Sequence, residues 1–128
     1  MPGAVHPRAL WTHEDTERQF PILSSALVTE QYVVFGGRDK RLKALDPKTG
    51  RSLWTFTTGG RIDSSPILVA ERVFFGSSDG NVYAVSVKTG EEVWRFETGA
   101  PVSASPATAD GALVISNEDG VIYCFGVE

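Results

Sequence analysis

The chain has 128 residues, a net charge of −4 at pH 7 and a hydrophobic fraction of 41%. This length suits one compact domain, and the balance of hydrophobic and charged residues excludes an intrinsically disordered chain. The 12 Lys and Arg residues are scattered among 16 acidic residues, apart from one group at residues 38–41. Such scattering excludes the clustered basic groove that nucleic-acid binding requires.

The single cysteine, Cys124, excludes an intramolecular disulfide and a multi-cysteine metal site. No apolar run approaches the roughly 20 residues of a membrane-spanning helix. The N-terminal segment MPGAVHPRALW also lacks the apolar centre of a signal peptide. We therefore expect this chain to be soluble, without a membrane span or a signal peptide of its own. The cellular compartment stays open.

Strand character begins at residues 8–13, where Trp11 is the large apolar residue. From about residue 21 onward, the sequence repeats with a period of 40 residues, so that Ser25 aligns with Ser65 and Ser105. Further aligned sets are Ser24, Ser64 and Ala104; Phe35, Phe75 and Ile115; Asp39, Asp79 and Asp119; Leu42, Val82 and Ile122; and Ala44, Ala84 and Cys124. A period near 40 residues is typical of propellers and solenoids.

One repeat contains four short strand segments separated by turns. In the second copy they are expected at residues 62–69, 72–76, 81–87 and 91–96, with Pro66 interrupting the first. No segment between turns is long enough for an amphipathic helix. Four strands in one such repeat are typical of a β-propeller blade.

The sequence thus predicts an all-β fold, a partial β-propeller with about three four-stranded antiparallel blades in one segment, residues 1–128. Blade 1 is expected at about 21–56, blade 2 at about 61–96, and blade 3 at about 101–126 without its outer strand. Residues 8–13 are expected to be a fourth strand without a blade of its own.

Three blades cannot close a ring, because propellers have about four to eight. We therefore expect either a homo-oligomer, with a dimer completing a six-bladed ring, or missing blades in a longer chain. In the dimer, residues 10–11 of one subunit would pair beside residues 121–125 of the other. Such pairing would protect two open sheet edges.

Residues 44–54 have the form A-L-D-x-x-T-G-x-x-x-W, which returns at residues 84–94 with Ser86 in place of the Asp. This motif resembles the blade signature of the pyrroloquinoline-quinone-like (PQQ-like) repeat family. That family includes quinoprotein dehydrogenases and the scaffold lipoprotein of outer-membrane barrel assembly, and its members are often exported to the periplasm. Residues 119–126 resemble the C-terminal blades of bacterial members.

The resemblance implies that Trp54 and Trp94, and by position Trp11, dock between neighbouring blades. Gly50 and Gly90 follow a Thr at the turn into the outer strand, where glycine permits a left-handed backbone at little steric cost. These five residues are therefore expected to be structural. A ligand-stacking role is the alternative for the tryptophans.

Quinoprotein members of the family bind the quinone beside a calcium ion held by Glu and Asn. No such set can be placed on this sequence, so no cofactor-binding, metal-binding or catalytic residue is assigned. His6 and His13 lack the partners of a zinc site. The turn aspartates occur once per blade, and serines that recur in every blade indicate architecture rather than a nucleophile.

The exception to the repeat is residues 37–41, where Arg38, Lys40 and Arg41 replace the acid-and-glycine turn of the other blades. This hairpin is either a solvated basic turn or a contact for an acidic protein or peptide. We favour a non-catalytic binding or scaffold module that uses a propeller face. The alternatives are a degenerate or split quinoprotein-type redox domain and purely structural blades.

Overall fold

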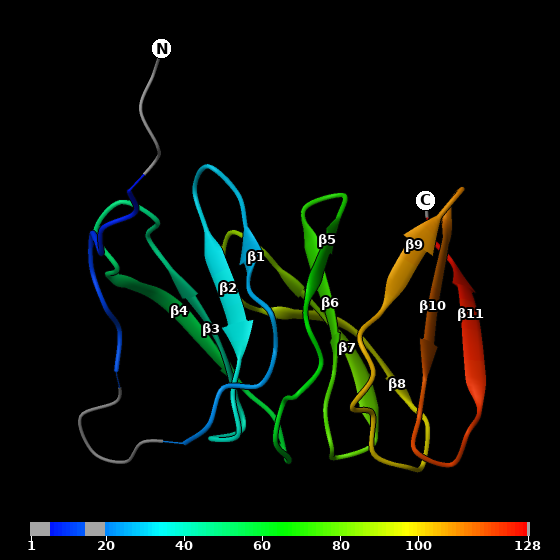
Figure 1. The fold of residues 1–128 in the computed structure, drawn as a ribbon. Coiled ribbons are helices and arrows are strands. Elements are labelled where there is room, and N and C mark those ends of the chain that lie inside the picture. The colour runs from blue at the N-terminus through cyan, green and yellow to red at the C-terminus, as the bar shows by residue number, and fades with distance from the viewer. Residues whose placement is uncertain (1–5, 15–19, 128) are drawn as a thin grey trace.

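The computed structural model describes residues 6–14 and 20–127. It contains three antiparallel sheets that lie side by side (Figure 1), which we call blades 1, 2 and 3. Blade 1 holds β1 (Leu27–Val28), β2 (Val33–Gly36), β3 (Arg41–Leu45) and β4 (Ser52–Thr57). Blade 2 holds β5 (Ile67–Val69), β6 (Arg72–Gly76), β7 (Asn81–Ser86) and β8 (Glu92–Glu97), and blade 3 holds β9 (Ala107–Ala109), β10 (Ala112–Ser116) and β11 (Ile122–Gly126).

The expected all-β fold and the propeller blades are confirmed. Strands follow each other within each blade from the inner to the outer edge, and short turns join them. Over the residues that it describes, the structure has no helix long and apolar enough to cross a membrane.

The first strand of blade 2 is shorter than the sequence predicts. It begins at Ile67, whereas the expected strand began at residue 62. The physical reason lies in the connection before it, where Ile62 is fully buried and its N–H bonds to Gly37 O of blade 1. This backbone therefore links two blades and does not join the ladder of its own sheet.

Residues 8–13 form no ladder in the single chain, so the expected outer strand, which would pair with another copy or with further blades, stays a prediction. A fourth strand pairs with the third strand of its own blade, as β4 pairs with β3. Among the described residues, no such third strand lies beside residues 8–13. The ladder hydrogen bonds that define a strand are therefore not made.

Apolar side chains are buried between the blades in two clusters. Val34, Leu42 and Ala44 of blade 1 pack against Val73 and Phe75 of blade 2, and all five are fully buried. The cluster between blades 2 and 3 repeats this arrangement with Phe74, Val82, Ala84, Leu113 and Ile115. Blade 2 therefore buries one face against blade 1 and the other against blade 3.

Tryptophan rings close these contacts at the upper end of the molecule. The Trp54 indole N–H donates to Val87 O at 2.8 Å. Its ring lies against Gly90, whose φ is +75°. A Cβ on Gly90 would come within 2.5 Å of Trp54 Cδ2. Glycine is needed at this position for both its backbone angle and its lack of a side chain.

Trp11 repeats the same contact one blade earlier. Its indole N–H donates to Pro47 O at 2.8 Å, and its ring lies 2.7 Å from the place that a Cβ of Gly50 would take. Residues 8–13 therefore occupy the position of an outer strand in front of blade 1, although they form no ladder in the single chain (Figure 1).

Replacing Trp54 with alanine is expected to lower the free energy of unfolding by about 3 kcal/mol, because a large apolar ring and a hydrogen bond between blades are both lost. Thermal and urea unfolding measure this change. Leu53→Ala, at the exposed neighbour in β4, is the control and should cost far less. A Trp54→Ala variant as stable as the wild type would contradict the docking role.

Candidate functional site

The lower end of the molecule carries the turns that join β2 to β3, β6 to β7 and β10 to β11 (Figure 1). The three turns share one backbone frame, since Gly37 N–H donates to Arg41 O, Ser77 N–H to Asn81 O, and Asn117 N–H to Val121 O. Differences between their side chains therefore decide the chemistry of each turn.

In blade 2, Asp79 is held by hydrogen bonds. It accepts the N–H groups of Gly59 and Asn81, both at 3.0 Å, and the hydroxyl of Tyr83. Burial raises the pKa of Asp79, but these hydrogen bonds outweigh burial and hold the pKa below its usual 3.8. Burial and the bond to Asp79 raise the pKa of Tyr83 to about 12. Because Gly59 follows β4 of blade 1, the bond from its N–H to Asp79 holds blades 1 and 2 together at this turn.

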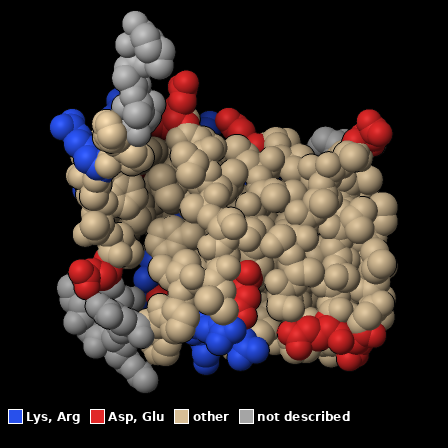
Figure 2. Space-filling model, viewed as in Figure 1, with Lys and Arg blue, Asp and Glu red and all other residues tan. Residues whose placement is uncertain are grey.

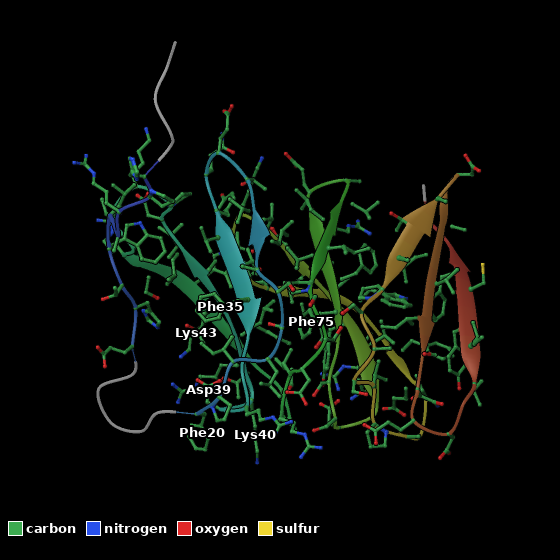
Figure 3. The ribbon with its side chains drawn as sticks, viewed as in Figure 1. Phe20, Phe35, Asp39, Lys40, Lys43 and Phe75 are labelled. Atoms are coloured by element: carbon green, nitrogen blue, oxygen red, sulfur yellow. The ribbon has the colours of Figure 1, made fainter. Side chains whose placement is uncertain are left out.

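In blade 1, Lys43 takes the place of Tyr83 and forms an ion pair with Asp39 at 2.8 Å. The two side chains are only 13% and 12% exposed. His13 takes the place that Phe56 has at the next junction, and its ring meets Phe35 edge to face at 5.9 Å. Figure 3 shows Phe35, Asp39 and Lys43 together on this side of blade 1.

A cavity of about 250 Å³ opens beside the Asp39–Lys43 pair. At the next junction the corresponding space holds the packed rings of Phe56, Phe75 and Tyr83. The cavity is lined by His13, Glu14, Phe20, Ile22, Phe35, Gly37, Asp39 and Lys43. The space between the N-terminal segment and blade 1 therefore holds an ion pair and a cavity. The space between blades 1 and 2 is filled by aromatic rings.

The basic turn lies at the lower end of blade 1. Arg38 makes a two-pronged contact with Asp63 of the next connection, with Nε–Oδ1 and Nη2–Oδ2 both at 3.1 Å. Arg61 approaches the same carboxylate at 3.5 Å. Lys40 and Arg41 are exposed. Lys40 has a φ of +72°, a left-handed conformation that is uncommon for a residue with a side chain.

Charge is distributed unevenly along this end of the molecule. Figure 2 shows lysine and arginine side chains gathered at the lower end, and acidic side chains gathered further along toward blade 3. The turn of blade 3 carries Glu118 and Asp119 at the positions of Arg38 and Asp39. The lower end therefore runs from basic at blade 1 to acidic at blade 3.

The recurring serines join neighbouring blades. Ser25 N–H donates to Ser65 Oγ at 2.7 Å, and Ser65 N–H donates to Ser105 Oγ at 2.8 Å. Ser64 Oγ accepts the N–H of Gly76 in its own blade. Ser64 and Ser65 lie just before β5 and outside it, whereas the sequence placed them in a strand at residues 62–69.

Other candidates stay apart. Cys124 is an exposed free thiol on β11. Among residues 6–14 and 20–127, no three His, Cys, Asp or Glu side chains converge into a metal site. His6 and His13 are both in the N-terminal segment, and the His13 ring contacts Phe35 of blade 1.

Sequence reasoning missed Asp63, the partner of Arg38. Its repeat positions hold Leu23 and Ser103, so the repeat pattern carries no acidic signal there. It also missed Lys43, which reads as an ordinary polar residue of a strand. Only the blade-to-blade alignment reveals that it replaces a tyrosine.

The raised pKa of Tyr83 predicts a change at alkaline pH. The folded state holds the Tyr83 hydroxyl proton more tightly than the unfolded chain does. The stabilisation of the fold by this protonated hydroxyl is therefore fully present below pH 10 and is lost as pH rises toward 12. The free energy of unfolding should fall over this window by an extra amount on the order of 1 kcal/mol. Tyr83→Phe should lack this extra fall, and the control Tyr32→Phe should keep it. Urea unfolding at several pH values measures it; equal slopes for Tyr83→Phe and the wild type would contradict it.

Comparison with solved structures shows the fold. BamB from Moraxella catarrhalis superposes with a TM-score of 0.72 and 22% identity, over 82% of this chain and 34% of that one. The computationally designed Ika8 protein superposes with a TM-score of 0.75 and 18% identity, over 92% of this chain and 36% of that one. Quinohemoprotein alcohol dehydrogenase from Comamonas testosteroni gives 0.75 and 20%, over 85% of this chain and 20% of that one.

Curated relatives are much longer than this chain. Quinoprotein alcohol dehydrogenase PedE of Pseudomonas putida is 39% identical over 61 residues, which is 47% of this chain and 9% of that protein. Quinoprotein ethanol dehydrogenase of Pseudomonas aeruginosa is 38% identical over 64 residues, which is 49% of this chain and 10% of that protein. The match thus covers about a tenth of the length of these relatives.

A family model described as outer membrane protein assembly factor BamB matches residues 38–127. The match includes β3 and β4 of blade 1 and the whole of blades 2 and 3. Because this is more than half of the sequence, the chain belongs to the PQQ-like repeat family of β-propellers represented by that model.

Proposed function

We propose that this chain is a non-catalytic binding module that presents the lower face of its blades to a protein or peptide with an acidic contact segment. The observation that supports the proposal is the basic turn of blade 1. It departs from the repeat, and it gathers Arg38, Lys40 and Arg41 on a chain whose net charge is −4.

The turn is suited to recognition because its frame is rigid and its basic groups are accessible. Asp63 orients the Arg38 guanidinium, while part of that side chain stays exposed. Lys40 and Arg41 extend from the same hairpin, whose backbone is fixed by the bond from Gly37 to Arg41. Asp63 already takes the two-pronged face of Arg38, so an acidic partner would bind the remaining N–H donors of Arg38 together with the exposed Lys40 and Arg41.

Completion of the propeller is part of this proposal. Three blades expose the outer surfaces of the first and the last, and either a second copy or further blades of a longer chain would cover them. The superposition on about a third of BamB and of Ika8 is consistent with completion by other blades.

A second candidate function is a quinoprotein-type redox domain, because quinoprotein dehydrogenases are among the relatives of this chain. The described residues do not form the converging set of acidic ligands that a calcium ion would need, so we derive no step through a quinone. Incubation with calcium and pyrroloquinoline quinone, followed by absorbance after removal of free quinone, tests this candidate. Retained quinone absorbance would favour it over the binding module.

The binding proposal is tested with a fluorescent polyglutamate peptide and fluorescence anisotropy. Arg38→Ala combined with Arg41→Ala should weaken binding about tenfold, because two charge-assisted contacts are lost. The melting temperature should stay within a few degrees. The matched control is Lys48→Ala with Arg51→Ala, which removes the same charge from the exposed turn at the opposite end. Equal weakening in both double variants, or none in the first, would contradict the proposal.

A further inference from the structure

The connection from blade 1 to blade 2 brings a further arginine, Arg61, to the lower end of the molecule, where basic side chains gather (Figure 2). Its side chain is 53% exposed, and its Nε lies 3.5 Å from Asp63 Oδ2. The same carboxylate binds Arg38. Asp63 itself is only 16% exposed, so one largely buried carboxylate holds two arginines at the surface.

All three members of this ion cluster depart from the repeat. Their repeat equivalents are Ser78 and Glu118 for Arg38, Pro21 and Pro101 for Arg61, and Leu23 and Ser103 for Asp63. The departures therefore coincide at one contact, between blades 1 and 2.

The backbone does not require an arginine at residue 61. In each repeat the carbonyl at this position accepts an N–H from the following turn: Ser78 N–H donates to Arg61 O, Arg38 N–H to Pro21 O, and Glu118 N–H to Pro101 O. Proline makes this bond equally well, and it also lowers the entropy of the unfolded chain. The side chain of Arg61, rather than its backbone, therefore accounts for the departure.

The two arginines differ in the donors that they have left. A guanidinium carries five N–H donors in a rigid fork. Asp63 takes both Nε and Nη2 of Arg38, at 3.1 Å each. Arg61 approaches the carboxylate through Nε at 3.5 Å, which is longer than a well-formed hydrogen bond. The edge of Arg61 formed by Nη1 and Nη2 is therefore available for a second carboxylate.

The backbone on both sides of Arg61 is held in place. Gly59 N–H donates to Asp79 at 3.0 Å, and Ile62 N–H donates to Gly37 O at 2.9 Å. A fixed backbone reduces the entropy that is lost on binding. These contacts join blades 1 and 2, so they do not depend on what precedes blade 1 or follows blade 3.

We propose that Arg61 makes the two-pronged contact with a carboxylate of the acidic partner, through Nη1 and Nη2. Asp63 is a positioning residue that orients Arg61 and Arg38 together. Lys40 and Arg41 add positive charge from the neighbouring turn. This inference rests on the proposed binding of an acidic partner, and it places the central contact of that site between blades 1 and 2.

A charge-preserving variant tests the geometry of this contact. Lysine keeps the positive charge, but its ammonium group cannot form two parallel hydrogen bonds with a carboxylate. Arg61→Lys should therefore weaken binding of a fluorescent polyglutamate peptide about fivefold, measured by fluorescence anisotropy. The matched control is Arg41→Lys. Arg41 is exposed and pairs with no carboxylate that the structure describes, so this variant should stay within about twofold of the wild type.

A second variant takes its residue from the repeat itself. Arg61→Pro installs the residue of the two equivalent positions and keeps the carbonyl that Ser78 N–H requires. Its melting temperature should stay within a few degrees of the wild type, while binding should weaken about tenfold. Arg61→Gln removes the charge without constraining the backbone and should give the same loss. Arg72→Ala, at an exposed arginine where β6 begins, removes the same charge and should bind as the wild type does.

Wild-type binding by both Arg61→Pro and Arg61→Gln, with the Arg38→Ala and Arg41→Ala double variant weakened, would overturn this assignment and leave the proposed function standing. Loss of binding in Arg61→Gln but not in Arg61→Lys would reduce residue 61 to a point charge and overturn the two-pronged contact. Unchanged binding in all of these variants would contradict the proposed function itself. The two failures are therefore distinguishable.

Discussion

Burial of one blade's face by the next is the constraint on which the rest of this structure depends. A single four-stranded sheet has two apolar faces and cannot bury either alone. Val34 and Leu42 of blade 1 become fully buried only because Val73 and Phe75 of blade 2 lie against them. Backbone bonds such as Ile62 N–H to Gly37 O hold neighbouring blades at this spacing. Stability is therefore a property of pairs of blades.

Because the contact between blades recurs along the chain, equivalent contacts can be compared within one molecule. Between blades 1 and 2, Asp79 and Tyr83 close the lower end with a hydrogen bond, and aromatic rings fill the space behind it. In front of blade 1 the same frame carries Asp39 and Lys43, and a cavity replaces the rings. Lys43 in place of Tyr83 and His13 in place of Phe56 accompany the change from a junction filled by aromatic rings to one with an ion pair and a cavity.

The chemical differences between the three blades are greatest in the turns. The fully buried strand residues face neighbouring blades, so packing limits those positions to apolar types. The turns at the lower end are released from this requirement, and there the chain differs most between blades, from Arg38 and Lys40 in blade 1 to Glu118 in blade 3. A rigid frame with variable turns is the usual arrangement for recognition surfaces.

The sequence by itself determined the all-β class, the repeat, the family resemblance and the turn glycines, because each depends on local periodicity or on a single backbone angle. Only the tertiary structure decided that Ser25 and Ser65 bond across junctions and that Asp63 holds Arg38. These features arise where separate repeats meet. A repeat pattern aligns residues that are equivalent, whereas contacts join residues that are not, so the pattern cannot show which side chains meet.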